Sequence, residues 1–157
     1  MSDQKEKFMR EAIRLAQESA ATGGGPFGAV VVKDDAIVGR GQNRVVPDRD
    51  PTAHAEVLAI RQACRALDTH ELGGCEIYAS CEPCPMCLGA IYWARLDMVY
   101  YSSTRDDAAA AGFDDSLFYY EFGKPLEQRR TPSEQLLSLE ASAVLVDWAV
   151  RTDKVVY

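Results

Sequence analysis

Two short motifs in the chain have the residue types and spacing needed to hold a metal ion. They are H-x-E at residues 54–56 and P-C-x-x-C at residues 83–87. One imidazole and two thiolates suit Zn²⁺, and three protein ligands leave one position of a tetrahedral ion open. An open position is typical of a catalytic zinc, which lowers the pKa of a bound water to about 7. The motifs therefore predict a catalytic zinc site with His54, Cys84 and Cys87 as ligands.

Glu56 is the candidate for proton transfer at this site, because it lies two residues from His54. Hydrolytic deamination moves protons twice, first off the water and then onto the leaving amine, and a carboxylate suits that work. The combined pattern, H-x-E followed by P-C-x-x-C, is the signature of zinc-dependent nucleobase deaminases.

The cysteines also allow other interpretations. Cys81 could join the three ligands and close a four-ligand structural zinc site, and a lone Cys-x-x-Cys could be a redox pair. Five cysteines could form disulfides, but five is an odd number and no secretory-signal pattern precedes them. The paired motifs and the helical stretch after each favour the catalytic site. Cys81 is then expected to be a buried thiol at a strand end, and Cys64 and Cys75 to be core residues.

Length and composition narrow the class of protein. A chain of 157 residues with 47% hydrophobic content is expected to form one globular domain. The net charge of −7 argues against a nucleic-acid partner and favours a small neutral substrate. No apolar run is long enough to span a bilayer, so no membrane association is expected. Reduced cysteines and thiolate ligands favour a cytoplasmic location.

Helical and strand patterns alternate along the chain, which predicts an α/β fold, a three-layer α/β/α sandwich with a mixed sheet. A tight turn at Asp34-Asp35 is expected between the first two strands, and a polar loop over residues 43–50. The expected helices are 3–21, about 53–67, 83–95 and a short alanine-rich one, with His54 and Glu56 in the first turn of the second. The expected strands are 27–33, 36–42, 76–80 and 98–101.

From Ser116 to Tyr157 the sequence changes character. An aromatic cluster at 117–120 precedes a polar stretch with two prolines, and residues 141–150 have a helical pattern. This stretch is too apolar to remain in solvent, so it is expected to pack on its own domain or on a partner subunit. The sequence leaves both options open.

Four stretches make the chain similar to the bacterial guanine deaminases of the cytidine-deaminase-like superfamily. They are residues 24–30, 50–57, 80–95 and 111–115, the last containing Gly-Phe-Asp-Asp. The resemblance is close over residues 8–125 and loose in the tail. It implies a five-stranded sheet flanked by helices and a homodimer. It also implies one zinc deaminase domain over residues 1–157, with 116–157 exchanged between subunits.

The resemblance also implies a role for individual residues. His54, Cys84 and Cys87 would bind zinc, and Glu56 would transfer protons. Phe27 and Trp93 would stack on a purine, Asn43 would form a hydrogen bond to the purine edge, and Ala55 would line the site. Tyr157 from the partner's tail would close the pocket. Without the resemblance, Phe27 and Trp93 are expected to be core aromatics more often than stacking partners. Asn43 could form a turn, and Tyr157 would normally belong to a frayed terminus.

Asp115 is the residue on which substrate identity depends. Guanine presents N1–H and 2-amino donors, and adenine lacks the 2-amino group. A carboxylate only accepts, so it matches the guanine edge and leaves an adenine edge poorly satisfied. Such a mismatch in a dry site discriminates by about 10⁴-fold in favourable cases. On composition alone Asp114 and Asp115 are ordinary turn residues, whereas the resemblance makes Asp115 a guanine contact and a candidate relay for the second proton.

The predicted function is zinc-dependent hydrolysis of guanine to xanthine and ammonia. Alternatives with the same chemistry are a guanosine or cytosine deaminase and a tRNA adenosine deaminase, the last opposed by the charge of −7. The alternative outside enzymes is a structural zinc module that binds a partner through its aromatic tail.

Overall fold

The computed structural model describes residues 2–157, so Met1 of the expected 1–157 domain lies outside the described residues. The chain divides into two compact units, one ending at Asp115 and one spanning Ser116–Tyr157. Among residues 2–157, no helix has both the length and the apolar character needed to cross a membrane.

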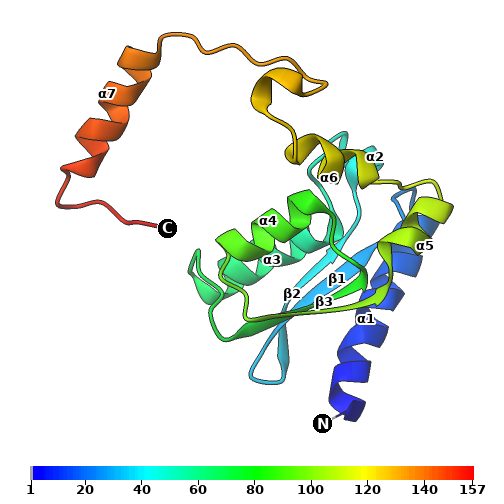
Figure 1. The fold of residues 1–157 in the computed structure, drawn as a ribbon. Coiled ribbons are helices and arrows are strands. Elements are labelled where there is room, and N and C mark those ends of the chain that lie inside the picture. The colour runs from blue at the N-terminus through cyan, green and yellow to red at the C-terminus, as the bar shows by residue number, and fades with distance from the viewer. Residues whose placement is uncertain (1) are drawn as a thin grey trace. The chain divides into compact units, whose positions relative to one another are not determined.

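A four-stranded mixed sheet forms the centre of the first unit, in the order β2-β1-β3-β4 (Figure 1). The strands are β1 (Gly28–Lys33), β2 (Ala36–Gln42), β3 (Cys75–Cys81) and β4 (Met98–Ser103). β1 is antiparallel to β2 and to β3, and β3 is parallel to β4. The expected tight turn is confirmed: Asp34 and Asp35 both have positive φ, 47° and 60°, as a two-residue hairpin turn of type I′ requires.

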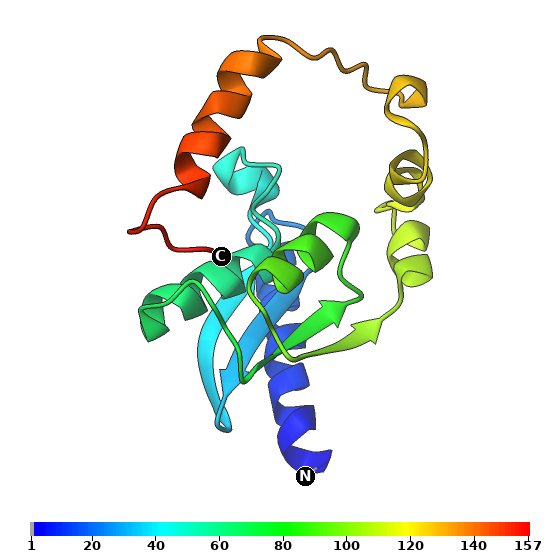
Figure 2. The ribbon, with the colours of Figure 1, turned by 60° about the vertical axis from the view of Figure 1, so that its left-hand side comes forward.

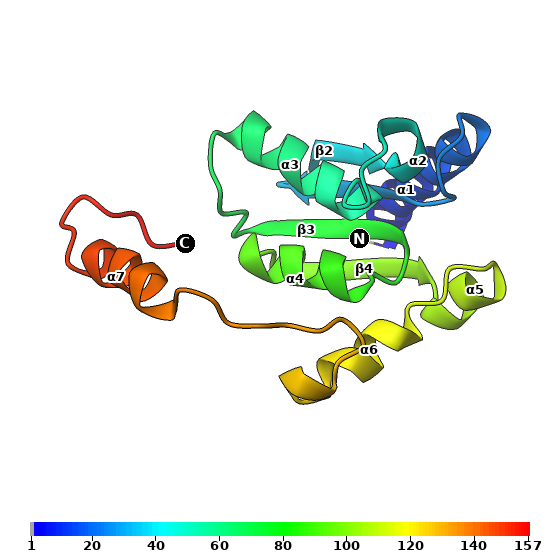
Figure 3. The same ribbon diagram turned by 90° about the horizontal axis from the view of Figure 1, so that it is seen from above.

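Helices cover both faces of this sheet, which confirms the three layers (Figures 2 and 3). One face carries α1 (Ser2–Ala21), and the other carries α3 (Ala55–Leu67) and α4 (Pro85–Trp93). Side chains alternate along the strands, so Val30 packs with Phe8 of α1 in one core cluster, whereas Val31 and Ile77 pack with Ala59 of α3 in the other.

The expectation of a fifth strand is wrong for residues 2–157, in which the sheet has four. After β4 the chain forms α5 (Arg105–Ala110), α6 (Ser116–Phe122), the 3₁₀ turn η1 (Leu126–Gln128) and α7 (Ser138–Ala149). Three of the six residues of α5 are alanine, the best helix former, so the chain directly after β4 continues as a helix and not as a fifth strand. On β4, Met98 and Tyr101 are about half exposed.

Two local details also differ from the sequence-based expectation. Residues 43–50 were expected to be loop, but they contain the one-turn helix α2 (Val45–Asp48), held by an Arg44–Asp48 ion pair. Four residues are too few to show a helical period, so the pattern could not reveal it. α3 begins at Ala55, so His54 is its N-cap residue and does not lie in the first turn.

The second unit presents its apolar side chains to solvent. None of the twelve residues of α7 is buried, and Leu139, Leu145 and Trp148 are 87%, 71% and 44% exposed. A helix with this much exposed apolar surface is typical of a segment that packs against another surface.

Candidate active site

The starts of α3 and α4 supply the predicted zinc ligands. His54 is the N-cap residue of α3 and Cys84 that of α4, both in extended backbone conformation, and neither side chain caps its own helix. Cys87 is buried in the first turn of α4, which Pro85 helps to begin. Because α3 and α4 lie on the same face of the sheet, their first residues come together (Figure 3).

The three ligand atoms have the spacing of a tetrahedral zinc site. His54 Nδ1 lies 3.6 Å from Cys84 Sγ and 3.5 Å from Cys87 Sγ, and the three atoms lie within 4.8 Å of one another. Tetrahedral bonds of about 2.0–2.1 Å to nitrogen and about 2.3 Å to sulfur place N and S about 3.6 Å apart. The residues present therefore fit Zn²⁺.

The charges of the cluster favour a divalent cation. The hydrogen bond between the two thiols lowers the pKa of Cys84 to about 4, and the same bond raises the pKa of Cys87. The contact with Cys84 also raises the pKa of His54. A cation held by both sulfurs would favour their thiolate forms, because metal ligands bind deprotonated.

Glu56 lies in the first turn of α3 beside this cluster, and its side chain is buried. Burial raises the pKa of its carboxyl group, and a hydrogen bond to Cys87 partly opposes that shift. A buried carboxyl group with a raised pKa is well suited to accept and return a proton.

Asn43, the residue after β2, is held in one orientation. Its Oδ1 accepts hydrogen bonds from the backbone N–H of Gly25 (3.1 Å) and of Val45 (3.2 Å), and its own N–H donates to the carbonyl of Phe27 (3.0 Å). With Oδ1 occupied by two donors, the Nδ2 hydrogens are the part of the amide that is left to bind a ligand.

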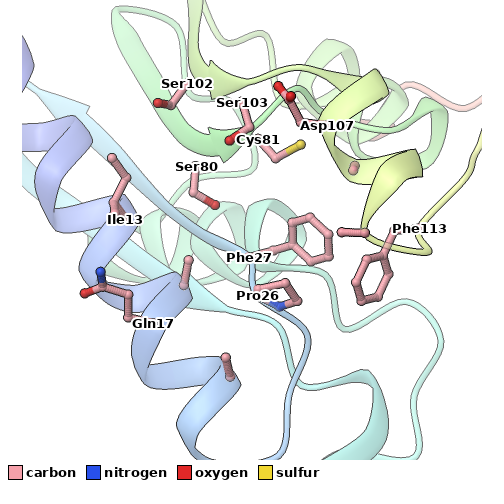
Figure 4. Close-up of a pocket in the computed structure, with 14 residues that line it drawn as sticks. Ile13, Gln17, Pro26, Phe27, Ser80, Cys81, Ser102, Ser103, Asp107 and Phe113 are labelled. Carbon is pink, nitrogen blue, oxygen red and sulfur yellow. The ribbon is translucent and has the colours of Figure 1, made fainter.

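Phe27 forms an edge-to-face pair with Phe113, with ring centroids 4.9 Å apart. The two rings border a hollow of about 450 Å³, which Ile13 and Gln17 of α1 line on its other side (Figure 4). The zinc-ligand candidates do not line it. Phe113 was not predicted individually from the sequence, although it belongs to the Gly-Phe-Asp-Asp stretch.

The remaining predicted residues occupy different surroundings. Asp115 is half-buried, and burial raises the pKa of its carboxyl group, with an opposing effect from Arg105 and a reinforcing one from the charge of Cys84. Ala55 is fully buried at the start of α3. Trp93 is 63% exposed at the far end of α4 from its cysteines, about 9 Å along the axis from Cys87. Tyr157 belongs to the second unit.

The other cysteines fit the expectations for residues that do not bind metal. Cys81 is the buried last residue of β3, Cys75 is fully buried, and Cys64 is half-buried against the same core. All five cysteines are free thiols.

Comparison with known proteins gives matches that cover the site. The model of the cytidine and deoxycytidylate deaminase zinc-binding region matches residues 2–103. The guanine deaminase of Bacillus subtilis is 54% identical over 91% of this chain and 92% of its own. A tRNA-specific adenosine deaminase of Aquifex aeolicus is 44% identical over 63% of this chain and 66% of its own. The X-ray structure of the Bacillus subtilis guanine deaminase superposes with a TM-score of 0.93, at 52% identity, over 97% of this chain and 98% of the other.

Proposed function

The chain belongs to the cytidine and deoxycytidylate deaminase family with its zinc-binding region, and on that premise we propose that it hydrolyses guanine to xanthine and ammonia. The observation that carries the choice of guanine is the extent of the match. A guanine deaminase matches 91% of the chain, whereas a tRNA-specific adenosine deaminase matches 63%. The net charge of −7 also disfavours a tRNA substrate.

In this proposal His54, Cys84 and Cys87 hold Zn²⁺, in keeping with their 3.5 and 3.6 Å separations. When bound, Zn²⁺ acts as a Lewis acid and makes a water nucleophilic at neutral pH by lowering its pKa to about 7. The remaining steps depend on groups of the chain itself.

Glu56 accepts a proton from the attacking water while the water oxygen bonds to C2 of guanine. It passes that proton to a ring nitrogen beside C2, which gives a tetrahedral carbon. The hydroxyl group now on C2 then gives up its proton, which passes to the exocyclic amine. The bond from C2 to the amine breaks as the C2–O bond becomes a carbonyl, so ammonia leaves and xanthine remains. Burial raises the pKa of Glu56 and so brings it nearer to the range in which one carboxyl group can both accept and donate.

The proposed substrate contacts divide between stacking and edge recognition. Phe27 and Trp93 stack on the purine, and Ala55 lines the site. The Nδ2 hydrogens of Asn43 bind an acceptor on the purine edge, which the fixed orientation of its amide supports. Asp115 accepts from the donor edge of guanine and relays the second proton, supported by its electrostatic interaction with Cys84.

We further propose a homodimer in which residues 116–157 of each chain pack on a second copy of the chain. The support is that this segment is a separate unit whose helix α7 has no buried residue. The edge strand β4 of the first unit also leaves Met98 and Tyr101 about half exposed. Tyr157 of the partner subunit then closes the pocket. Five free cysteines and thiolate ligands support a cytoplasmic location for this dimer.

Ammonia release tests the substrate. Zinc-loaded protein is assayed in parallel with guanine, guanosine, adenine, cytosine and a tRNA anticodon stem. Release from guanine alone supports the proposal, and turnover of a nucleoside or of the tRNA contradicts the choice of guanine. Asp115→Asn is expected to reduce activity on guanine by at least about 10²-fold, because a carboxamide presents donors to a donor edge.

Complementation tests the exchange of the tail. Glu56→Gln inactivates one chain, and Tyr157→Ala weakens the other. If tails are exchanged, a mixed dimer made by co-expression has one complete site, with Glu56 from one chain and Tyr157 from the other. Activity above that of either variant alone supports exchange, whereas activity equal to their average contradicts it.

A further inference from the structure

Ser19 carries a buried polar group that the proposed chemistry does not use. It lies in the last turn of α1 and is 1% exposed. Its Oγ lies 2.7 Å from the carbonyl oxygen of Gly25 and 2.8 Å from that of Asn43. A hydroxyl has one proton, so it is shared between the two carbonyls. Ser19 therefore joins α1 to two loops that are 18 residues apart in the sequence.

These contacts close into a ring of three residues. Ser19 donates to the backbone of both Gly25 and Asn43, and the backbone N–H of Gly25 donates to Oδ1 of Asn43. Gly24 lies within this ring, where a Cβ atom would stand 2.2 Å from the Asn43 carbonyl oxygen and 2.4 Å from Ser19 Oγ. The ring is thus packed so closely that only glycine fits at position 24.

The ring determines how Asn43 presents its amide. Ser19 holds the backbone carbonyl of Asn43, and Gly25 together with Val45 holds the side-chain oxygen. A rotation that exchanged Oδ1 and Nδ2 would place amide hydrogens against two backbone N–H donors, so it is disfavoured. Phe27 is tied to the same ring, because its N–H donates to the Gly25 carbonyl (2.8 Å) and its carbonyl accepts from the Asn43 N–H (3.0 Å).

We propose that Ser19 is a positioning residue for substrate recognition, which acts by holding Asn43 with its Nδ2 hydrogens directed to the purine edge. The inference rests on the proposed function, since it assigns Asn43 to the recognition of a purine acceptor. Ser19 does not touch the substrate. Its loss leaves zinc binding and proton transfer by Glu56 in place and affects mainly the binding of the purine.

The test is a double-mutant cycle on the full-length zinc-loaded protein. Ser19→Ala is expected to raise KM for guanine about tenfold with kcat changed less than about twofold, because a small misplacement of a binding group is enough. In an Asn43→Ala background the same substitution is expected to have no further effect. Thr22→Val is the matched control, because it removes a hydroxyl from the same helix end. Among residues 2–157, that hydroxyl donates to the backbone carbonyls of Glu18 and Ser19 and to neither Gly25 nor Asn43.

Gly24→Ala tests the ring from its other side, because its Cβ atom would push the Asn43 carbonyl and Ser19 Oγ away. It is expected to raise KM like Ser19→Ala and to have no further effect in the Asn43→Ala background. An unchanged KM in both variants, or an equal rise in KM in the Asn43→Ala background, would overturn the proposal.

A measurement without turnover separates this proposal from the proposed function. The two Nδ2 hydrogens of Asn43, assigned in an NMR amide spectrum from their absence in Asn43→Ala, are expected to shift or broaden in Ser19→Ala and to stay unchanged in Thr22→Val. Unchanged signals in Ser19→Ala overturn the inference even if guanine is the substrate. Absence of ammonia release by the wild-type protein overturns the proposed function whatever these signals do.

Discussion

Replacing Gly41 by alanine is expected to lower activity, because the added Cβ atom would displace the start of α3. Gly41 lies in β2, and a Cβ atom there would stand 1.9 Å from the carbonyl oxygen of Ala55 and 2.6 Å from the N–H nitrogen of Ala59. Both atoms belong to the backbone of α3, so no side chain can turn aside to make room. Ala55 lies between His54 and Glu56 in the chain, and a shift of its backbone moves both functional residues.

The size of the effect follows from these distances. An ordinary van der Waals contact begins at 3.4 Å, so the backbones of β2 and α3 must separate by about 1.5 Å at Ala55. Overpacking of this kind costs about 1–3 kcal/mol of unfolding free energy. A displacement of about 1 Å in a catalytic group can cost about 10²-fold in rate. Gly41→Ala is therefore expected to lose about 10²-fold in kcat/KM while remaining folded.

The assays are urea unfolding, zinc per subunit, and kcat/KM for guanine. Gly73→Ala is the matched control, because a Cβ atom at position 73 meets nothing within 4 Å. The control is expected to behave as the wild type. If Gly41→Ala kept wild-type kcat/KM, the close contact between β2 and α3 would not be what positions the site. A loss of stability with unchanged kcat/KM would separate packing from positioning and would also refute the argument.

Three further substitutions test separate parts of the molecule. Glu56→Gln is expected to keep zinc and lower kcat by at least about 10²-fold, and full activity would remove it from proton transfer. His54→Ala is expected to lose the metal, measured as zinc per subunit, and intact stoichiometry would contradict its role as a ligand. Arg14 and Arg40 lower the pKa of Glu11 from 4.5 to about 2. The carboxylate therefore stabilises the fold fully above pH 4.5, and this contribution disappears as the pH falls towards 2. Glu11→Gln is expected to abolish that part of the acid dependence, about 1 kcal/mol after solvent screening of the half-exposed arginines, and an unchanged pH profile of urea unfolding would contradict it.

The layers and the candidate metal cluster could be predicted because each depends on a local pattern in the sequence. Strand alternation and helical periodicity located seven of the elements of the first unit, from α1 to β4, to within a few residues. The two motifs predict the cluster of His54, Cys84 and Cys87, whose ligand atoms lie within 4.8 Å of one another. The sequence places these residues at the starts of two helices. Their distances from one another depend on how α3 and α4 pack on one face of the sheet, which the sequence pattern does not give.

Contacts between segments that are far apart in the sequence could not be predicted, because no local sequence pattern indicates them. Ser19 is an ordinary serine on a helical pattern, and its role depends on where residues 25 and 43 lie in space. The pairing of Phe27 with Phe113 joins two aromatic residues that are 86 positions apart. The fifth strand was inferred from the resemblance and not from the residues, and the local helical preference of the chain after β4 opposes it.

The helix starts at the candidate metal site lack the usual cap hydrogen bonds. An N-cap residue normally accepts a hydrogen bond from the first turn, as Thr104 does at the start of α5. His54 and Cys84 occupy the same position in α3 and α4 without any such bond. The loss of a good cap costs about 1 kcal/mol, so the two helix starts together give up about 2 kcal/mol. Zinc binding to such ligand sets contributes about 10 kcal/mol or more in small zinc-binding peptides, which offsets that cost several times over. If His54 and Cys84 bind zinc as proposed, metal binding explains why these residues stand at helix starts that they do not cap.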